Sequence, residues 1–299
     1  NWEQKMSGLL KELEAVEFKR LPEMVDLADV TGAKGQTEAF DIIDTYDRLI
    51  NLGLKAWQYH FEFLNLGYAA YLTFMDFCKK AFPDIGDQTV SRMVSGVDVI
   101  LFKPDEEIKR LARLAVDLDV ASAFKGSRKP EQTLAELGQS SNGRKWLEEF
   151  EKAKDPWFYL SSGTGFYHHH TAWINDLSIP FTALLGYVEK LERGESLERP
   201  LNALRQERDR LATEYRELLP TEQDKGTFDQ LLQTARTVFP YVENHLFYVE
   251  HWFHTVFYGK IRDLAKIFVE HKFFEDTEDI FDLHRTEVRE ANYDMAAAW

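Results

Sequence analysis

WQYHFEFLNLGYAAYLTFMDF, residues 57–77, decides the fold, because it is apolar on nearly every face of a helix. It belongs to a longer helical pattern that runs from Asp41 to Phe82 and is ended by Pro83. A helix that is apolar all round is typically buried. We therefore predict a long central helix with one polar stripe that faces a cavity or a partner helix. The stripe consists of Gln58, Glu62, Asn65 and Asp76.

A second segment has the same character. Residues 237–260, TVFPYVENHLFYVEHWFHTVFYGK, lie in a helical pattern from Gly226 to Lys272, which Pro240 should kink. One stripe of this helix carries Glu243, Phe247, Glu250, His254 and Phe257. The other helical patterns are shorter and are separated by Pro or Gly. The sequence thus predicts an all-α fold, a large helical domain built on two long, antiparallel, buried aromatic-rich helices.

With 299 residues the chain can form one large helical domain, and we expect residues 1–299 to do so as a substrate-binding domain. The alternative is two helical halves, 1–154 and 181–299, joined by a His- and aromatic-rich loop at 155–180. A further loop is expected around residues 31–35, and the last helix is expected to reach Trp299.

The net charge of −15 argues against nucleic acid or an anionic membrane surface as a partner. No apolar run has spanning length and no signal peptide is visible, so a cytoplasmic location is expected. The single cysteine, Cys78, excludes an intrachain disulfide. Because it lies in an apolar helical run, we expect a buried, inert thiol.

The candidate site is the loop DPWFYLSSGTGFYHHHTAWINDLSIP, residues 155–180, with three consecutive histidines. Loops on a rigid scaffold often carry function. A neutral histidine can remove a proton from a hydroxyl near pH 7. Neighbouring side chains diverge, so three in a row rarely hold one ion together. We predict that one of His168, His169 and His170 is catalytic, and the sequence leaves open which.

Aromatic residues make up 14% of the chain, and polar residues are interleaved with them on the long helices. This pattern favours an aromatic-lined pocket for an apolar or aromatic ligand. The predicted substrate-binding residues are Trp57, His60, Phe61, Glu62, Trp157, Tyr159, Tyr167, Trp173, Glu250, Trp252 and His254, with Phe253 beside them.

Metal and nucleotide motifs are absent from the sequence. No Glu is followed three residues later by His, as a di-iron bundle requires. Glu250 with His254, or Glu62 with His60, could support one metal ion, but a hydrogen-bonding role is favoured for each. There is no G-x-x-x-x-G-K-[ST], G-x-G-x-x-G or G-x-S-x-G. We therefore predict no metal and no cofactor in this chain.

Three stretches carry a family resemblance: residues 60–116, which begin HFEFLNLGYAAYL; WFYLSSGTGFYHHHTAWINDLSIPF, residues 157–181; and the connector FFEDTEDIFDLHRTEV, residues 273–288. They resemble the central helical region of phosphoenolpyruvate-utilising phosphotransferases. The relevant members are phosphoenolpyruvate-synthase-like enzymes that phosphorylate organic hydroxyls, including phenylphosphate synthase and rifampicin phosphotransferase.

The resemblance implies a division of labour. In such enzymes an ATP-grasp domain uses ATP and Mg to make the phosphoryl donor, a mobile domain carries a phosphohistidine, and the helical region binds the acceptor. This chain resembles only the acceptor-binding region. It would be a transferase (kinase) component that is incomplete on its own, acting on a phenol or another organic hydroxyl.

The family's phosphohistidine motif has the form T-x-H-x-x-I-x-x-R-x-x-x-I-P. Counting back from Pro180 places His169 at the histidine, but Asn175 stands at the arginine. The phosphohistidine is therefore expected outside this chain, on the mobile domain. A loop histidine would take the hydroxyl proton in a pocket between the long helices, while Arg92 or Lys103 would neutralise the phosphoryl group.

Two other functions remain open from sequence. One is a non-catalytic helical protein that binds an apolar or aromatic ligand, and the other is a metal-dependent helical enzyme. The sequence leaves open the identity of the acceptor, the oligomeric state, and whether the chain is a natural subunit or an excised domain.

Overall fold

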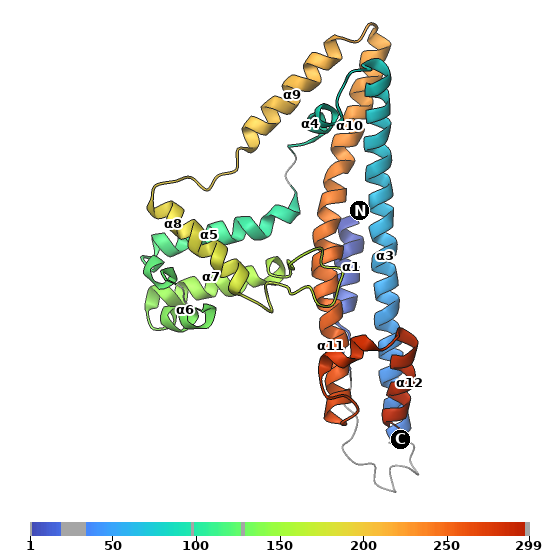
Figure 1. Ribbon diagram of the computed structural model, residues 1–299, viewed down its shortest axis with the longest axis vertical. Coiled ribbons are helices and arrows are strands. Elements are labelled where there is room, and N and C mark those ends of the chain that lie inside the picture. Colours follow the sequence, from blue (N-terminus) through green and yellow to red (C-terminus); the bar gives the residue numbers. More distant parts are fainter. Residues whose placement is uncertain (1, 19–33, 97–98, 127–128, 297–299) are drawn as a thin grey trace. The chain divides into compact units, whose positions relative to one another are not determined.

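The computed structural model describes residues 2–18, 34–96, 99–126 and 129–296 (Figure 1). Throughout these ranges the regular elements are helices, and the only β pairing is an isolated bridge between Ser161 and Ala172. The predicted all-α fold is confirmed. Residues 31–33 of the expected loop and the expected helix end at Trp299 lie outside the described ranges.

Residue contacts divide the chain into two compact units. The first comprises residues 1–59, 163–171 and 248–299, and the second comprises residues 60–162 and 172–247. These boundaries differ from those expected from the sequence, which were one domain over residues 1–299 or two halves at 1–154 and 181–299.

The first unit takes the N-terminal part of one long helix, the π-helix η3 (Leu246–Phe253) from residue 248 onward, and four shorter elements. These are α1 (Trp2–Glu14), α3 (Lys34–Ala81) up to residue 59, α11 (His254–Glu270), η4 (Thr277–Asp282) and α12 (Arg285–Ala296).

Apolar residues at helical spacing build the core of the first unit. The α1 helix buries Met6, Leu9 and Leu13 and contacts α11, and η4 also packs on α11. The Tyr46 hydroxyl of α3 donates to the Arg285 carbonyl at 3.1 Å, which ties α12 to α3. These helices form the scaffold on which the histidine loop lies.

The second unit contains the rest of α3 and most of the remaining helices. These are α4 (Asp87–Val94), η1 (Ile100–Phe102), α5 (Lys103–Asp117), η2 (Ala121–Phe124), α6 (Pro130–Leu137), α7 (Ser141–Trp157), α8 (Ser178–Glu192), α9 (Leu201–Glu217) and α10 (Glu222–His245).

Helices α5 to α8 surround one core of the second unit. The α5 helix begins as its sequence predicts, with Pro104 near its start and acidic side chains in its first turn, where they favour the helix dipole. Its buried residues, from Ile108 to Ala115, recur at helical spacing. They pack with Trp146 and Phe150 of α7, and the Trp146 indole donates to the Leu111 carbonyl at 2.9 Å.

A second core of this unit joins the C-terminal part of α3 to α4, α9 and α10. Phe74 and Phe228 meet edge to face at its centre, 5.4 Å between ring centroids. Cys78 is fully buried there, and burial raises the pKa of its thiol to about 12. The expected burial of this thiol is confirmed.

The predicted polar stripe of α3 lies on the surface. Gln58, Glu62, Asn65 and Asp76 are all exposed. Large apolar side chains of the same helix are exposed as well, among them Phe61 at 54% and Tyr68 at 56%. Packing against neighbouring elements buries only one face of α3. Because apolar atoms commonly make up much of a protein surface, a helix with an apolar sequence on every face need not be buried on every face.

The second long helical pattern is divided into three parts. Pro240 lies inside α10, and a π-helix, η3 (Leu246–Phe253), separates α10 from α11. A π-helix spaces its hydrogen bonds five residues apart rather than four. The predicted stripe from Glu243 to Phe257 assumed that the α-helical period continues through this segment. The π-helix η3 interrupts that period, so residues on its two sides no longer share the predicted face.

No helix among the described residues is long and apolar enough to cross a bilayer.

Candidate functional site

The histidine run lies on the part of its loop that belongs to the first unit. Residues 163–171 are in that unit, whereas the flanking residues 155–162 and 172–180 are in the second. The flanks pair through the Ser161–Ala172 bridge and through the Trp173 N–H, which donates to the Leu160 carbonyl at 2.9 Å. The two ends of the histidine segment are thereby held close together.

His170 closes the histidine segment on itself. Its Nδ1 accepts a hydrogen bond from the Gly165 N–H at 3.1 Å. Gly163 has φ +74°, and a Cβ there would lie 2.9 Å from the His170 ring, so the ring occupies the space that a glycine leaves. Because Nδ1 accepts, it carries no proton in this arrangement. His170 therefore has a structural role in the segment.

His168 is held by three groups from α11 and η4. Its carbonyl accepts a hydrogen bond from Arg262 at 2.9 Å. Its ring stacks on Phe281, with 4.2 Å between centroids and 15° between planes. Its Nδ1 lies 3.8 Å from a carboxylate oxygen of Glu278. The backbone and the ring face are thus each fixed by a contact, whereas Nδ1 lies near the Glu278 carboxylate without a hydrogen-bond partner among the described residues.

Arg262 and Glu278 form a bidentate ion pair beneath His168, with N–O distances of 2.5 and 2.9 Å. The Arg262 hydrogen bond holds the pKa of Glu278 below its usual value, so this carboxylate is charged at neutral pH. A charged carboxylate beside Nδ1 favours a proton on that nitrogen. The remaining nitrogen, Nε2, is then the basic one, which is the arrangement of a base oriented by a third group.

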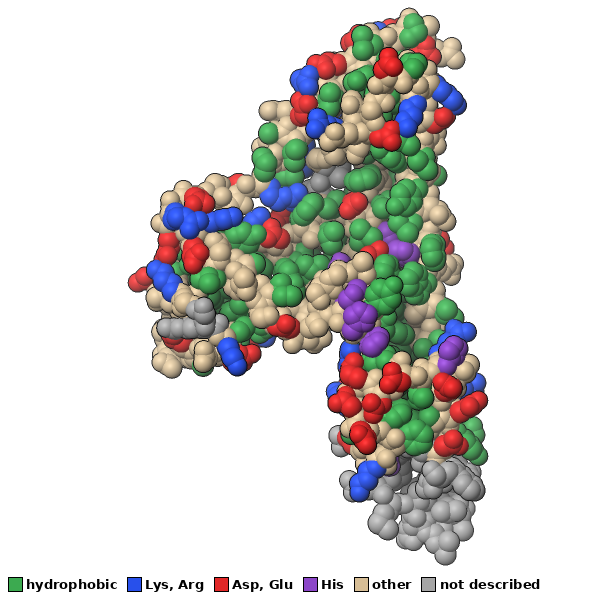
Figure 2. Space-filling model, in the orientation of Figure 1, with side chains coloured by type: hydrophobic (Ala, Val, Ile, Leu, Met, Phe, Trp, Pro, Cys, Tyr) green, Lys and Arg blue, Asp and Glu red, His purple; other side chains and the backbone are tan. Residues whose placement is uncertain are grey.

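His169 is the exposed member of the run. Its ring stacks on Tyr167 at 5.5 Å, and Tyr167 is itself 58% exposed. Figure 2 shows histidine side chains gathered on one face of the molecule, next to a group of acidic ones.

Behind the run, His254 sits in an aromatic enclosure. Its ring lies 5.5 to 5.8 Å from the rings of Trp57, Phe166, Phe253 and Tyr258. Trp57 and Phe166 stack at 5.0 Å, and the Tyr258 hydroxyl donates to the Phe166 carbonyl. The segment is therefore anchored to α3 and α11 by aromatic packing.

His254 and His251 are both buried, and a hydrogen bond fixes the protonated nitrogen of His254. His254 Nδ1 lies 2.5 Å from the Val249 carbonyl, so it carries the proton. Burial, with His254 and His170 nearby, lowers the pKa of His251 to about 4. Both are kept from serving as the exposed base by their buried positions.

The predicted substrate-binding residues fall in both units. Those in the first unit are Trp57, Tyr167, Glu250, Trp252, Phe253 and His254, and those in the second are His60, Phe61, Glu62, Trp157, Tyr159 and Trp173. The basic residues expected to assist, Arg92 and Lys103, are in the second unit, where Lys103 pairs with Glu106 at 2.8 Å. The structure thus brings Trp57 and His254 together with the histidine segment.

Two cavities of the second unit are lined by other residues. One lies between α5 and the segment that leads into α9. The other, of about 190 Å³, is bounded by Gly67, Tyr68, Tyr71, Ser91, Val94, Phe239 and Val242.

His60 takes part in a buried histidine pair of the second unit. Its Nδ1 lies 3.0 Å from Nε2 of His245, and the two side chains are 5% and 0% exposed. Burial lowers the pKa of His60, and burial together with His60 lowers that of His245 to about 4. Glu62, considered with His60 as a metal ligand, is exposed.

This pair predicts a pH dependence of stability. The folded pKa of His245 lies below its ordinary value of 6.5, so the unfolded chain binds the extra proton first as pH falls. Stability should decline from about pH 6.5 towards pH 4, and His245 should account for about 2 kcal/mol between pH 7 and 5. Urea unfolding of His245→Gln at both pH values should show a smaller decline than wild type. His284→Gln, at an exposed site, should match wild type, and identical profiles for all three would contradict the assignment.

The sequence did not single out Arg262, Glu278 or Phe281 as site residues. Glu278 and Phe281 lie in the connector that carries the family resemblance, which was the available signal. Arg262 follows His254 and Tyr258 at spacings of four on α11, so the helical period of that stretch could have placed it on the same face.

No protein-family model matches the chain, and no curated protein matches it either.

Proposed function

We propose that this chain is the acceptor-binding part of a phosphotransferase, moving a phosphoryl group from a phosphohistidine on a separate mobile domain to a phenol or another organic hydroxyl. The observation that carries the proposal is the contact of His168 with Arg262, Glu278 and Phe281. It joins two of the three sequence stretches on which the family resemblance rests, the histidine loop and the connector.

The proposed step assigns each group one task. The acceptor hydroxyl gives its proton to Nε2 of His168 while its oxygen bonds to phosphorus. The P–N bond of the donor phosphohistidine breaks, and the departing imidazole keeps the electron pair. Glu278 stabilises the protonated His168, and the Arg262 charge lies close to the phosphoryl group. Positioning and charge stabilisation of this kind dominate phosphoryl transfer.

Exposed aromatic rings beside the base suit an aromatic acceptor. Tyr167 is 58% exposed and Trp57 is 37% exposed, and both belong to the first unit. Ring stacking on such faces contributes binding without demanding a charged acceptor, which fits the strongly acidic chain. The donor's ATP and Mg belong to the ATP-grasp partner, and an ATP-consuming system is consistent with a cytoplasmic location.

The function is tested by reconstitution. The chain is mixed with the phosphohistidine and ATP-grasp polypeptides of the same organism, ATP, Mg²⁺ and a panel of phenols and aliphatic alcohols. Phosphorus NMR should show a new aryl phosphate that requires the chain and the matching phenol. The control omits only the phosphohistidine polypeptide and should give no product.

Other outcomes favour the other functions. Saturable binding of a phenol, seen as quenching of tryptophan fluorescence, with no product from any acceptor would support a non-catalytic binding protein. Stoichiometric iron or manganese in elemental analysis of the purified chain would contradict the proposal in favour of a metal-dependent enzyme.

A further inference from the structure

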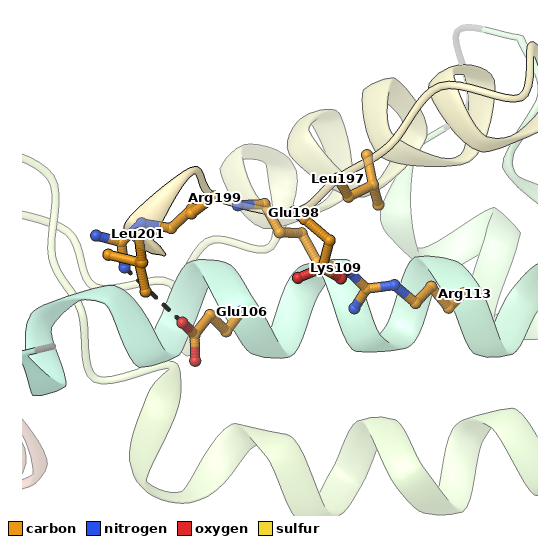
Figure 3. Close-up of a pocket in the computed structure, with 7 residues that line it drawn as sticks. All are labelled: Glu106, Lys109, Arg113, Leu197, Glu198, Arg199 and Leu201. Atoms are coloured by element: carbon orange, nitrogen blue, oxygen red, sulfur yellow. Dashed lines mark hydrogen bonds and ion pairs between the residues drawn. The ribbon is translucent and has the colours of Figure 1, made fainter. Parts of the chain in front are cut away.

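A polar cavity of about 280 Å³ lies in the second unit, between α5 and the segment that leads into α9 (Figure 3). None of its lining residues belongs to the first unit, which holds the histidine segment of the proposed acceptor site. Its lining residues are Glu106, Lys109, Arg113, Leu197, Glu198, Arg199 and Leu201.

Arg199 is the most constrained cation of this cavity. Its guanidinium lies 3.6 Å above the Phe102 ring, a cation–π contact that fixes the plane of the group. Its Nη1 is 3.8 Å from a Glu106 oxygen, an ion pair too long for a hydrogen bond. The same nitrogen is buried and has no hydrogen-bond partner among the described residues. The Arg199 charge is therefore only partly compensated by Glu106.

The charges around the cavity do not balance. Glu106 is shared, because it pairs with Lys103 at 2.8 Å as well as with Arg199. Lys109 pairs with Asp105 at 2.6 Å. Among the residues that line the cavity itself, three are cations (Lys109, Arg113 and Arg199) and two are carboxylates (Glu106 and Glu198). A local positive excess in a chain of net charge −15 favours an anionic ligand.

The carboxylate of Glu198 is the one that a ligand can replace. It pairs with Arg113 at 2.8 Å, but its side chain is 79% exposed. An exposed pair of this kind contributes little free energy. In Figure 3 the Arg113 side chain extends along α5 toward Glu198, and a dashed line joins Arg199 to Glu106. Displacing Glu198 would leave two uncompensated cations at the cavity.

We propose that this cavity binds the phosphate group of a small phosphomonoester. The phosphate oxygens accept hydrogen bonds from Arg113 in place of the Glu198 carboxylate, while the Arg199 charge, beside Glu106 at the other end of the cavity, adds to the electrostatic attraction (Figure 3). Arginine forks match phosphate geometry well. Leu197 and Leu201 contact the organic part of the ligand, and the volume limits that part to a small group.

The test measures binding of three probes to the full chain by isothermal titration calorimetry at constant ionic strength: inorganic phosphate, phenyl phosphate and benzoate. Phenyl phosphate should bind more tightly than the other two, because only it supplies both phosphate and an apolar group. Arg113→Gln should weaken its binding about tenfold or more, since a charge-assisted hydrogen bond is lost. Glu198→Gln should tighten it, because the competing carboxylate is removed.

Matched controls carry the same charge changes elsewhere on the second unit. Arg210 and Glu214 pair with each other on the exposed face of α9, so Arg210→Gln and Glu214→Gln should leave phenyl phosphate binding unchanged. Equal effects of the control and cavity variants, or no binding to either wild type or Glu198→Gln, would overturn the proposal. Benzoate binding as tightly as phenyl phosphate would overturn the assignment of phosphate. None of these results depends on phosphoryl transfer at His168, so the two proposals fail independently.

Discussion

Replacing His168 by alanine should reduce kcat/KM for phosphoryl transfer to a phenol by about 10²- to 10⁴-fold, the usual contribution of a positioned general base. The variant removes the imidazole that Glu278 and Phe281 orient, while Arg262 keeps its backbone contact with residue 168. The ring is partly exposed, with 40% of the side chain accessible, so thermal unfolding should change little. Transfer is measured in the reconstituted system and unfolding by circular dichroism.

The neighbouring histidines provide matched controls for this prediction. His169→Ala removes an exposed ring stacked on Tyr167 and should retain most activity. His170→Ala removes the acceptor of the Gly165 N–H, so it should lower stability and activity together. Near-normal transfer by His168→Ala, or the largest loss at His169, would refute the assignment of the base.

Gly143→Ala should give the largest loss of stability, about 3 kcal/mol or more, because it forces the backbone to move. An added Cβ would lie 1.9 Å from the Leu137 carbonyl oxygen and 2.6 Å from its carbon, both backbone atoms that no rotamer change can move away. The Gly143 N–H also donates to Ser140, which caps α7, at 2.8 Å. Urea unfolding of the full chain measures the change.

The matched control for that substitution is Gly226→Ala in α10, where an added Cβ meets nothing within 4 Å. It should stabilise the chain by up to about 1 kcal/mol, because alanine favours a helix over glycine. Equal stabilities for the two variants would show that α6 and α7 do not approach each other at Gly143 as described.

Local sequence signals predicted the helical architecture well. Apolar spacing and Pro83 placed the long α3 helix, and Pro104 with its acidic first turn placed the start of α5. These features depend on residues within one or two turns of each other, so they can be read without knowing the tertiary structure. Burial of Cys78 followed for the same reason.

Features that depend on distant contacts could not be predicted in this way. The π-helix η3 changes the period of a stretch whose composition resembles an ordinary buried helix. Which face of α3 is exposed depends on which other faces its neighbouring elements cover. Arg262 meets His168 across 94 positions of the chain, a separation that no local pattern reports.

The candidate site was predicted in part. The sequence located the histidine run and its aromatic surroundings, but it could not distinguish the three histidines, because their side chains differ only in what they contact. Contacts now separate them into an oriented ring at His168, an exposed ring at His169 and a structural ring at His170.

The most direct measurement of the central claim is a single-turnover chase. The mobile-domain polypeptide is phosphorylated on its histidine with labelled phosphate, freed of ATP, and mixed with phenol and an excess of this chain. The account predicts that label passes to phenol only when the chain is present, and far more slowly with His168→Ala. Label that never reaches the acceptor, or that reaches it equally fast without the chain, would contradict the account.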